Sequence, residues 1–456
     1  MTEFGKFGPL VGAIDEGTSS ARFIIFKANS ADVVATHQKE LAQHFPQEGW
    51  VEQDPYEILD VVTSCIIGAV DDLIKLGGKP EPLCGLPLSP YFSAVKLRWL
   101  SDNIESVKEG MKKGTCYFGT VDTWIIWNLT GGVNGGKHVT DVTNASRTML
   151  MNIENLHWDP VLLSFFEIPK SILPEIKSSS EVYGNIAAGP LQDCPIAGCL
   201  GDQQAALVGQ MCLQKGQAKA TYGTGCFVLY NTGEVIVQSS RGLLTTVAFQ
   251  FGPDTAPFYA LEGSVAVAGA ALGWLKDNIG MIETAKQSQD IAESATDNGS
   301  VVFVPAFSGL YAPYWRQDAR GVICGITEDT SSNHIVKAAL EAVCYQVRDI
   351  LDAMNEDCGI PLQMLKVDGG MTANSLVMQM QSDLIGINVI RAGFTESTAL
   401  GAAIVAYRGV KPAEQFSAVA ITNGFTYTPK ISEDERDTRY KQWKMAVERS
   451  LGWDKS

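Results

Sequence analysis

Residues 11–26 read VGAIDEGTSSARFIIF, and residues 218–230, roughly 200 positions further along, read AKATYGTGCFVLY. Each stretch predicts two apolar strands joined by a tight turn of glycine, threonine and serine. Glycine at such a tip lets the backbone approach a ligand, and the hydroxyl and N–H groups suit phosphate oxygens. Taken singly, either turn is also typical of an ordinary hairpin. The pair predicts two lobes that hold one nucleotide from opposite sides.

The first turn also carries an acid, Asp15. A hairpin does not need a carboxylate at this place. A carboxylate beside phosphate oxygens is expected where Mg²⁺ bridges the two. Asp15 is therefore the predicted metal ligand.

Composition limits the class of protein. The chain has 456 residues, of which 45% are hydrophobic, so it can form two or three domains with large cores. Its net charge of -16 and its lack of a Lys/Arg cluster argue against nucleic acid and anionic membranes as partners. No apolar run is long enough to predict a membrane span. Ten scattered cysteines without a Cys-x-x-Cys pair are typical of a reduced, cytoplasmic protein. The sequence is compatible with assembly into a homo-oligomer.

Apolar spacing predicts the secondary structure along the chain. Residues 10–42 predict a three-stranded meander, and residues 119–127 predict a strand. Residues 259–279 predict a strand followed by a helix. Residues 365–374, LKVDGGMTAN, predict a strand whose Gly-Gly turn opens a helix, which suits the base or α-phosphate of a nucleotide. Further helices are predicted over 56–76, 91–100, 334–354 and 434–453.

A candidate ligand-facing residue lies in residues 197–207, AGCLGDQQAAL. This stretch predicts a strand whose end presents Asp202, followed at once by a helix. Open α/β sheets place ligand-facing residues at such junctions. The alternative is that Asp202 is a helix N-cap, the commonest role of Asp at this kind of junction.

Several motifs carry a family resemblance. The turns Asp-x-Gly-Thr, Gly-Thr-Gly and Asp-Gly-Gly, in this order, resemble those of the two-lobed ATPases of the actin, Hsp70 and sugar-kinase superfamily. Residues 91–100, YFSAVKLRWL, are similar to a signature of its carbohydrate kinases. The glycerol kinase family is resembled over nearly the whole chain, most specifically in GWVEQDP (49–55), TNASR (143–147), GDQQAAL (201–207) and AFSGLYAPYW (306–315).

The resemblance implies an α/β fold of two ribonuclease-H-like (actin-like ATPase) lobes with a nucleotide cleft between them. Residues 1–206 would form the N-terminal lobe on the polyol side, and residues 207–456 the C-terminal lobe on the nucleotide side. The activity implied is transfer of phosphate from ATP, with Mg²⁺, to glycerol. Such a transfer needs alignment, charge neutralisation and a carboxylate that accepts the hydroxyl proton.

Carried over residue by residue, the resemblance also implies a site. Asp202 would be the general base. The polyol pocket would contain Tyr91, Asp202, Gln203 and Phe227. The nucleotide and its phosphates would be held by Thr18, Ser19, Ser20, Arg22, Thr224, Gly269, Gly370 and Asn374. Without the resemblance, Tyr91 and Phe227 are typical of core aromatics and Arg22 of a surface ion pair.

One part of the family pattern is missing. Glycerol kinases carry a strand ending in Asn-Gln-Arg-Glu, and then a Trp-bearing segment, before their Gly-Leu-Pro-Leu-Ser motif. This sequence passes from Pro82 to Gly85 without either, so one sheet strand is missing near 77–84. The lost residues would ligate the polyol and complete a parallel sheet. The alternative function is therefore an impaired or inactive glycerol-kinase-like isoform that binds nucleotide or a partner subunit.

Overall fold

The computed structural model describes residues 10–17, 20–27, 33–40, 84–87, 92–189, 191–295, 300–393, 397–413 and 424–454. Contacts divide the chain into two compact units. The first comprises residues 1–120 and 145–175, and the second comprises residues 121–144 and 176–456. The lobe boundary predicted at 206–207 stays a prediction.

The first unit contains the predicted meander. Strands β1 (Leu10–Gly17), β2 (Ser20–Lys27) and β3 (Val33–Glu40) form an antiparallel sheet in this order. The register pairs Asp15 with Arg22 and ends at Gly17 opposite Ser20. The hairpin predicted from the first glycine turn is thus confirmed.

The helix predicted over 91–100 is confirmed as α2, and the helix predicted over 56–76 lies outside the described residues. The other elements of the first unit are short. They are α2 (Ser93–Asn103), α3 (Glu105–Lys113), β5 (Met151–Asn152), β6 (His157–Trp158), α6 (Pro160–Phe165) and η2 (Lys170–Ile172).

A seven-stranded sheet organises the second unit, in the order β12-β13-β11-β10-β16-β17-β18. Its first four strands are antiparallel, β16 and β17 join in parallel to β10, and β18 is an antiparallel edge. Tyr222 pairs with Cys226 across the second predicted hairpin, which is confirmed. The strands are β10 (Ala218–Tyr222), β11 (Cys226–Gly233), β12 (Leu244–Phe249), β13 (Phe258–Val265), β16 (Met364–Asp368), β17 (Asn388–Arg391) and β18 (Phe425–Tyr427).

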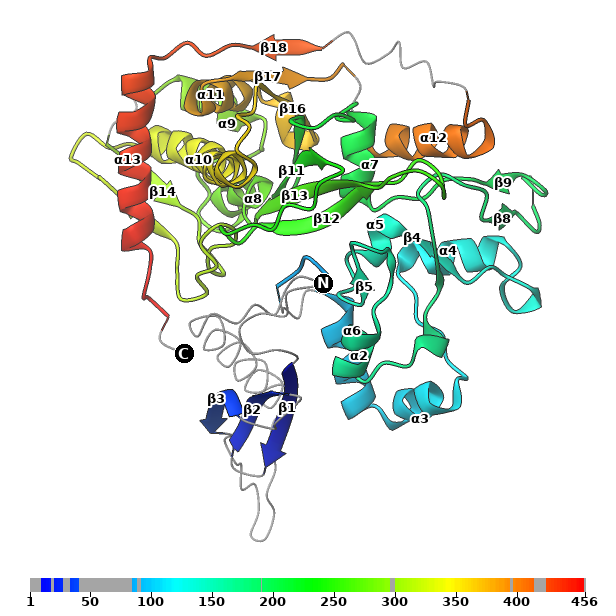
Figure 1. Cartoon of the computed structure of the whole chain (residues 1–456). Helices are drawn as coiled ribbons and strands as arrows, with labels where there is room; N and C mark the ends of the chain where they lie inside the picture. The colour runs from blue at the N-terminus through cyan, green and yellow to red at the C-terminus, as the bar shows by residue number, and fades with distance from the viewer. Residues whose placement is uncertain are drawn as a thin grey trace. The chain divides into compact units, whose positions relative to one another are not determined.

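Helices cover both faces of this sheet. Since side chains alternate along β10, successive residues of this strand contact helices on opposite faces. On one face Tyr222 donates a 2.7 Å hydrogen bond to Gln381 of α11 (Ser375–Ile385), beside the long helix α10 (Ser332–Cys358). On the other face Lys219 reaches Gln203 of α7 (Asp202–Gly209), and α12 (Ser397–Val410) packs on α7 (Figure 1). The helix predicted over 334–354 is confirmed within α10.

Helices α7 and α12 touch through their backbones. A Cβ atom added at Gly401 would collide with the carbonyl oxygen of Ala205. One added at Gly209 would collide with the carbonyl oxygen of Ser397. Glycine is therefore required at both positions, since a side chain would force the helices apart.

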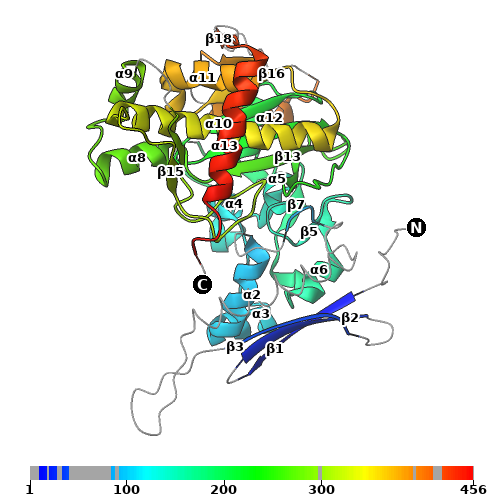
Figure 2. The same ribbon diagram turned by 90° about the vertical axis from the view of Figure 1, so that its left-hand side faces the viewer.

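The strand and helix predicted over 259–279 are confirmed as β13 and α8, and the helix predicted over 434–453 is confirmed as α13. Helix α13 packs against α10, α11 and the β14–β15 hairpin (Figure 2). The bounds are α8 (Gly269–Asp277), α9 (Gln287–Glu293), β14 (Val302–Val304), β15 (Val322–Cys324) and α13 (Glu433–Arg449).

The strand predicted over 119–127 is wrong, because most of these residues belong to helix α4 (Val121–Leu129). A short apolar run of β-branched and aromatic residues has no periodicity that separates a strand from a helix. In α4 the buried residues are Thr123 and Ile126, three positions apart, while Trp124 and Ile125 are exposed. Asp122 lies in the first turn, where a negative charge favours the helix.

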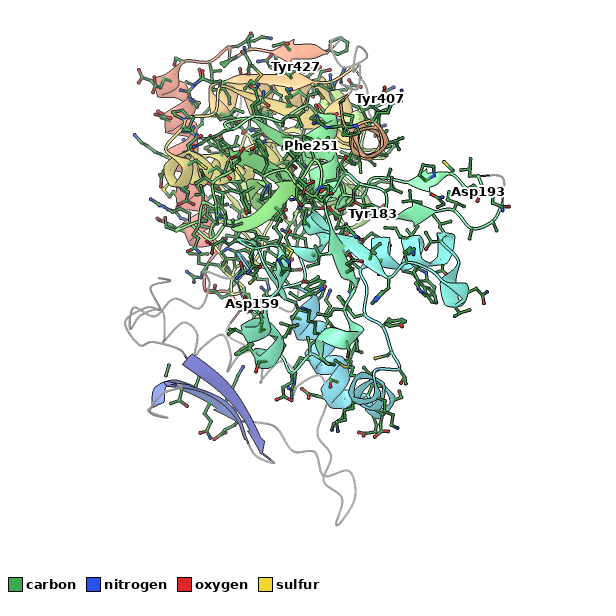
Figure 3. The ribbon with its side chains drawn as sticks, turned by 45° about the vertical axis from the view of Figure 1, so that its right-hand side comes forward. Asp159, Tyr183, Asp193, Phe251, Tyr407 and Tyr427 are labelled. Carbon is green, nitrogen blue, oxygen red and sulfur yellow. The ribbon has the colours of Figure 1, made fainter. Side chains whose placement is uncertain are left out.

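The remaining elements of the second unit lie beside α4. The β8–β9 hairpin extends from Tyr183 at its base to Asp193 at its far end (Figure 3). No helix among the described residues is apolar over a length that could cross a membrane. These elements are η1 (Gly132–Asn134), β4 (Val139–Asp141), α5 (Val142–Ala145), β7 (Glu175–Lys177), β8 (Gly184–Asn185) and β9 (Pro195–Ile196).

A buried carboxylate, Asp349 of α10, anchors α13. It accepts hydrogen bonds from Tyr440 at 2.5 Å, Trp443 at 2.8 Å and Lys444 at 3.0 Å. We expect Asp349→Ala to lower the free energy of unfolding in urea by about 3 kcal/mol, because the donors lose a buried charged acceptor. The matched control is Asp352→Ala, one turn later and 45% exposed, which should stay within about 1 kcal/mol of wild type. Equal losses in the two variants would contradict the anchoring role.

Candidate functional site

Three glycine-bearing segments meet at the end of β10. Gly223 N–H donates to the carbonyl of Gly225 at 2.8 Å, which closes the Gly-Thr-Gly turn. Gly269 N–H, at the start of α8, donates to the carbonyl of Gly223 at 3.0 Å. Gly369, with φ of +93°, lies so close to β10 that a Cβ atom would collide with the carbonyl of Tyr222. The structure thus brings together the second predicted hairpin, Gly269 and the predicted Asp-Gly-Gly turn.

The Gly-Thr-Gly turn serves as the cap of α8. Ala268, the N-cap residue, has no side chain that could accept a hydrogen bond, and the Thr224 carbonyl accepts from Ala268 N–H and Ala270 N–H, each at 3.0 Å. The first amides of α8 are therefore occupied by protein and do not remain for an anion. Thr224 itself is exposed, so its side chain faces outward from a turn that is fixed by main-chain bonds.

The Asp-Gly-Gly turn is open at Gly370, where a Cβ atom would meet no atom within 4 Å. The Asn374 side chain stabilises the fold nearby, because it caps α11 by accepting from Val377 N–H at 3.1 Å and donates to Ser288 at 3.4 Å. Glycines with open space beside an exposed threonine leave room for a phosphate chain or a nucleobase. Contact of Asn374 with adenosine stays a prediction.

Asp202 begins α7, but it is not the N-cap. The N-cap is Gly201, which has no side chain that could bond to the first amides of this helix. The alternative interpretation of Asp202 as a capping residue is therefore wrong. Its carboxylate is exposed and accepts one hydrogen bond, from Gln203 Nε2 at 3.0 Å. The predicted start of a helix at Asp202 is confirmed.

Asp141 fixes the backbone in front of α7. Gly201 N–H donates to Thr143 Oγ1 at 2.8 Å, and this hydroxyl donates to Asp141 at 2.9 Å. Asn144 and Ser179 also donate to Asp141, which is fully buried. Burial raises the pKa of Asp141 to about 6, against the opposing effect of the hydrogen bonds it accepts. Asp141 lies two positions before the motif at residues 143–147 and was not among the predicted site residues.

The register places Phe227 on the face of the sheet that α7 covers. Phe227 pairs with Thr221 on one side and Ser264 on the other, so the three side chains share the face that α7 covers. Thr221 and Gln203 both accept hydrogen bonds from the ammonium group of Lys219, which joins the strand to the helix. Phe227 is only half-buried, as a residue that lines a pocket would be.

Lys219 is a second site residue, besides Asp141, that was not among the predicted site residues. It is completely buried, and burial lowers its pKa, while the charges of Asp368 and Glu262 raise it. The available signal was a lysine in the middle of the apolar run AKATYGTGCFVLY. A lysine at such a position is almost never fully buried unless it has partners.

The other predicted residues belong to the first unit. Thr18, Ser19 and Tyr91 lie outside the described residues. Asp15, Ser20 and Arg22 lie on β1 and β2, on either side of the hairpin tip. Their roles toward phosphate and metal stay predictions.

Within the described part of the chain, one group of side chains has the spacing of metal ligands: Asp122, Asp141 and Cys199, whose ligand atoms lie within 4.8 Å of one another. Burial raises the pKa of the Cys199 thiol well above its usual range. The thiol donates to Asp122 at 3.7 Å. Asn144 donates to both Asp141 and Cys199, so hydrogen bonds join the three side chains in one cluster.

Comparison with known proteins gives relatives for the whole chain. The C-terminal domain of the FGGY family of carbohydrate kinases matches residues 218–410. The N-terminal domain of that family matches in two pieces, 10–80 and 70–209. A probable glycerol kinase from Dictyostelium discoideum is 44% identical over 538 aligned positions, covering 98% of this chain and 99% of the relative. A glycerol kinase from Arabidopsis thaliana is 46% identical over 515 positions, covering 98% of each.

Solved structures agree with these matches. The Plasmodium falciparum glycerol kinase with ADP superposes with a TM-score of 0.77 at 34% identity, covering 97% of this chain and 98% of that one. A xylulose kinase from Lactobacillus acidophilus, 20% identical, superposes with a TM-score of 0.71 over 96% of this chain and 97% of its own, which supports the fold.

The relatives are longer than this chain. Alignments of 538 and 515 positions with a chain of 456 residues leave positions of the relatives with no counterpart here. The N-terminal domain match is divided at residues 70–80, next to the strand predicted to be missing near 77–84. Both findings support that prediction.

Gly269 and Gly273, one turn apart in α8, allow a matched test of the turn. A Cβ atom at Gly269 would lie 2.7 Å from the carbonyl oxygen of Gly223, whereas one at Gly273 would meet nothing within 4 Å. We expect Gly269→Ala to destabilise the protein by about 1–3 kcal/mol through overpacking. Gly273→Ala should stabilise it by up to about 1 kcal/mol through helix propensity. Thermal unfolding measures both, and a stabilising Gly269→Ala would refute the close contact.

Asp141 gives a pH test. An acid whose folded pKa is raised binds its proton more tightly in the folded state, so its stabilising contribution is present at low pH and declines as the pH rises through about 6. We expect the advantage of wild type over Asp141→Asn in unfolding free energy to shrink by about 3 kcal/mol between pH 4 and pH 7. Urea unfolding of both proteins at four pH values measures it. An advantage that grows with pH would show that the carboxylate is stabilised as an anion.

Proposed function

Because this chain belongs to the FGGY family of carbohydrate kinases, we propose that it transfers the γ-phosphoryl group of ATP to a hydroxyl group of glycerol. The observation that carries the proposal is the Asp202 carboxylate. It is exposed at the first residue of α7, it is not used as a cap, and it lies on the same side of the sheet as Gln203 and Phe227. The relatives that are 44% and 46% identical over nearly the whole chain are a probable glycerol kinase and a glycerol kinase.

In the proposed reaction, Asp202 accepts the proton of the glycerol hydroxyl group while the hydroxyl oxygen attacks the γ-phosphorus of ATP. The bond from that phosphorus to the bridging oxygen of ADP breaks, and glycerol 3-phosphate leaves. Gln203 supplies an amide for the polyol hydroxyls, and Phe227 and Tyr91 supply apolar walls. A positioned base of this kind contributes about 10²- to 10⁴-fold to the rate.

The nucleotide is assigned to the glycine turns. Thr224, Gly269, Gly370 and Asn374 would hold ATP from the side of the seven-stranded sheet. The backbone openness at Gly370 and the outward-facing Thr224 support this assignment. Thr18, Ser19, Ser20 and Arg22 of the first hairpin would attend the phosphates. Asp15 would hold Mg²⁺, since carboxylate oxygens suit it, and the ion would neutralise phosphate charge.

We assign the reaction to the cytoplasm. The nine cysteines among the described residues are free. Free thiols are typical of a reducing compartment.

A second candidate function rests on the missing strand. The division of the N-terminal domain match at 70–80, and alignments longer than the chain, favour a glycerol-kinase-like protein that binds nucleotide without phosphorylating glycerol. Polyol hydroxyls would lack charged partners worth about 1.5–3 kcal/mol each.

We expect Asp202→Asn to lower kcat for glycerol-dependent ADP formation by about 10²- to 10⁴-fold with an unchanged melting temperature, because the exposed carboxylate does not cap its helix. The matched control is Asp290→Asn, an exposed acid in the first turn of α9, which should keep wild-type kcat.

Titration calorimetry separates the two candidates. ATP heat together with glycerol heat and turnover supports the kinase. ATP heat without glycerol heat or turnover, in well-folded protein, would replace the kinase proposal with the second candidate.

A further inference from the structure

We propose that Lys219 is a positioning residue of this site, whose ammonium group sets the orientation of the Gln203 amide and, through it, of the Asp202 carboxylate. The inference rests on the proposed function, in which Asp202 is the general base. It adds a residue that never needs to touch the substrate.

The hydrogen bonds form a directed chain. Lys219 Nζ donates to Gln203 Oε1 at 2.5 Å and to Thr221 Oγ1 at 2.9 Å. Gln203 Nε2 then donates to Asp202 Oδ2 at 3.0 Å. An ammonium group can only donate, and an ionised carboxylate can only accept. The Gln203 amide is therefore held in one of its two orientations, with oxygen toward Lys219 and nitrogen toward Asp202.

The reversed amide would be opposed at both ends. Its NH₂ group would face the ammonium group of Lys219, and its oxygen would face the carboxylate of Asp202. Without Lys219, only one hydrogen bond would distinguish the two orientations. Lys219 therefore favours the arrangement in which Asp202 Oδ2 accepts a hydrogen bond from Gln203. In the proposed site, Oδ1 is then the oxygen that contacts the substrate hydroxyl.

Burial makes Lys219 a rigid anchor for an exposed carboxylate. Lys219 is fully buried, whereas Gln203 is half-buried and Asp202 is exposed. The buried acids Glu262 and Asp368 balance its charge electrostatically. Glu262 lies on the same row of the sheet, across Leu229, and Asp368 pairs with Thr221. A buried charge has few positions in which its hydrogen bonds are satisfied, so its own mobility is small.

A mutant cycle tests the chain of hydrogen bonds in the full-length protein, with Lys219→Met, Gln203→Leu and the double variant. For Lys219→Met we expect kcat to fall about 10- to 100-fold, because the base is misplaced, while KM for ATP stays within twofold. If Lys219 acts through Gln203, adding Lys219→Met to Gln203→Leu should lower kcat by less than twofold further. Multiplying losses in the double variant would overturn the proposal, and so would wild-type kcat in Lys219→Met.

Lys366→Met is the matched control. Lys366 is the register partner of Lys219 on β16, and its ammonium group donates to the carbonyl of Gln210 at 2.8 Å, at the other end of α7. Its removal takes a lysine from the same sheet without touching Gln203. We expect kcat within twofold of wild type, and a loss equal to that of Lys219→Met would assign both effects to general destabilisation.

Gln203→Glu covers the case in which Lys219→Met does not fold. This variant keeps an acceptor for Lys219 and loses the donor to Asp202. We expect kcat to fall at least tenfold with a melting temperature no lower than that of wild type, and unchanged kcat would overturn the inference.

Failure of the proposed function gives a different result, namely no glycerol-dependent ADP formation in wild type. The cycle is then evaluated on melting temperatures. Non-additive shifts for positions 203 and 219 support the coupling, and fully additive shifts exclude it.

Discussion

The structure of the second unit depends on the close approach of main chains at the end of β10. The Gly-Thr-Gly turn, the start of α8 and the Asp-Gly-Gly turn are joined without intervening side chains, through bonds such as that from Gly269 N–H to the Gly223 carbonyl. A single Cβ atom at Gly269 or Gly369 would separate them. Because the turn also satisfies the first amides of α8, the geometry of the proposed nucleotide site and the stability of a helix depend on the same contacts.

Beneath this junction the two faces of the sheet have opposite character. Ala220 and Tyr222 face the apolar core around α10 and α11. Lys219, Glu262 and Asp368 bring full charges to the face that α7 covers. Such charges are tolerated because each sign is matched by the other within a few residues. The charged face is where the proposed base lies, so the apolar face supplies packing and the charged face carries residues proposed for the reaction.

Much of the fold could be predicted because it is encoded locally. Both glycine hairpins, the Asp-Gly-Gly turn and the helix that begins at Asp202 follow from turn residues and apolar spacing. The prediction of a strand over 119–127 was wrong because a short apolar run fits a strand or a helix equally well. Lys219 and Asp141 could not be predicted from sequence, since their roles depend on register and on partners such as Ser179, which is distant in sequence from Asp141. The missing strand could be predicted from the family pattern, because the Asn-Gln-Arg-Glu strand has no counterpart between Pro82 and Gly85.

The contact between α7 and α12 limits how far the proposed base can move. At Gly401 and Gly209 the two backbones are in direct contact. No side chain with several rotamers therefore separates α7, which carries Asp202, from α12 at these two positions. Side chains fluctuate among staggered states, and a helix resting on them inherits part of that motion. A helix that packs directly on another backbone is not displaced by such side-chain motion. The position of the Asp202 carboxylate is therefore set by contact between two helix backbones, which are the most rigid parts of the chain.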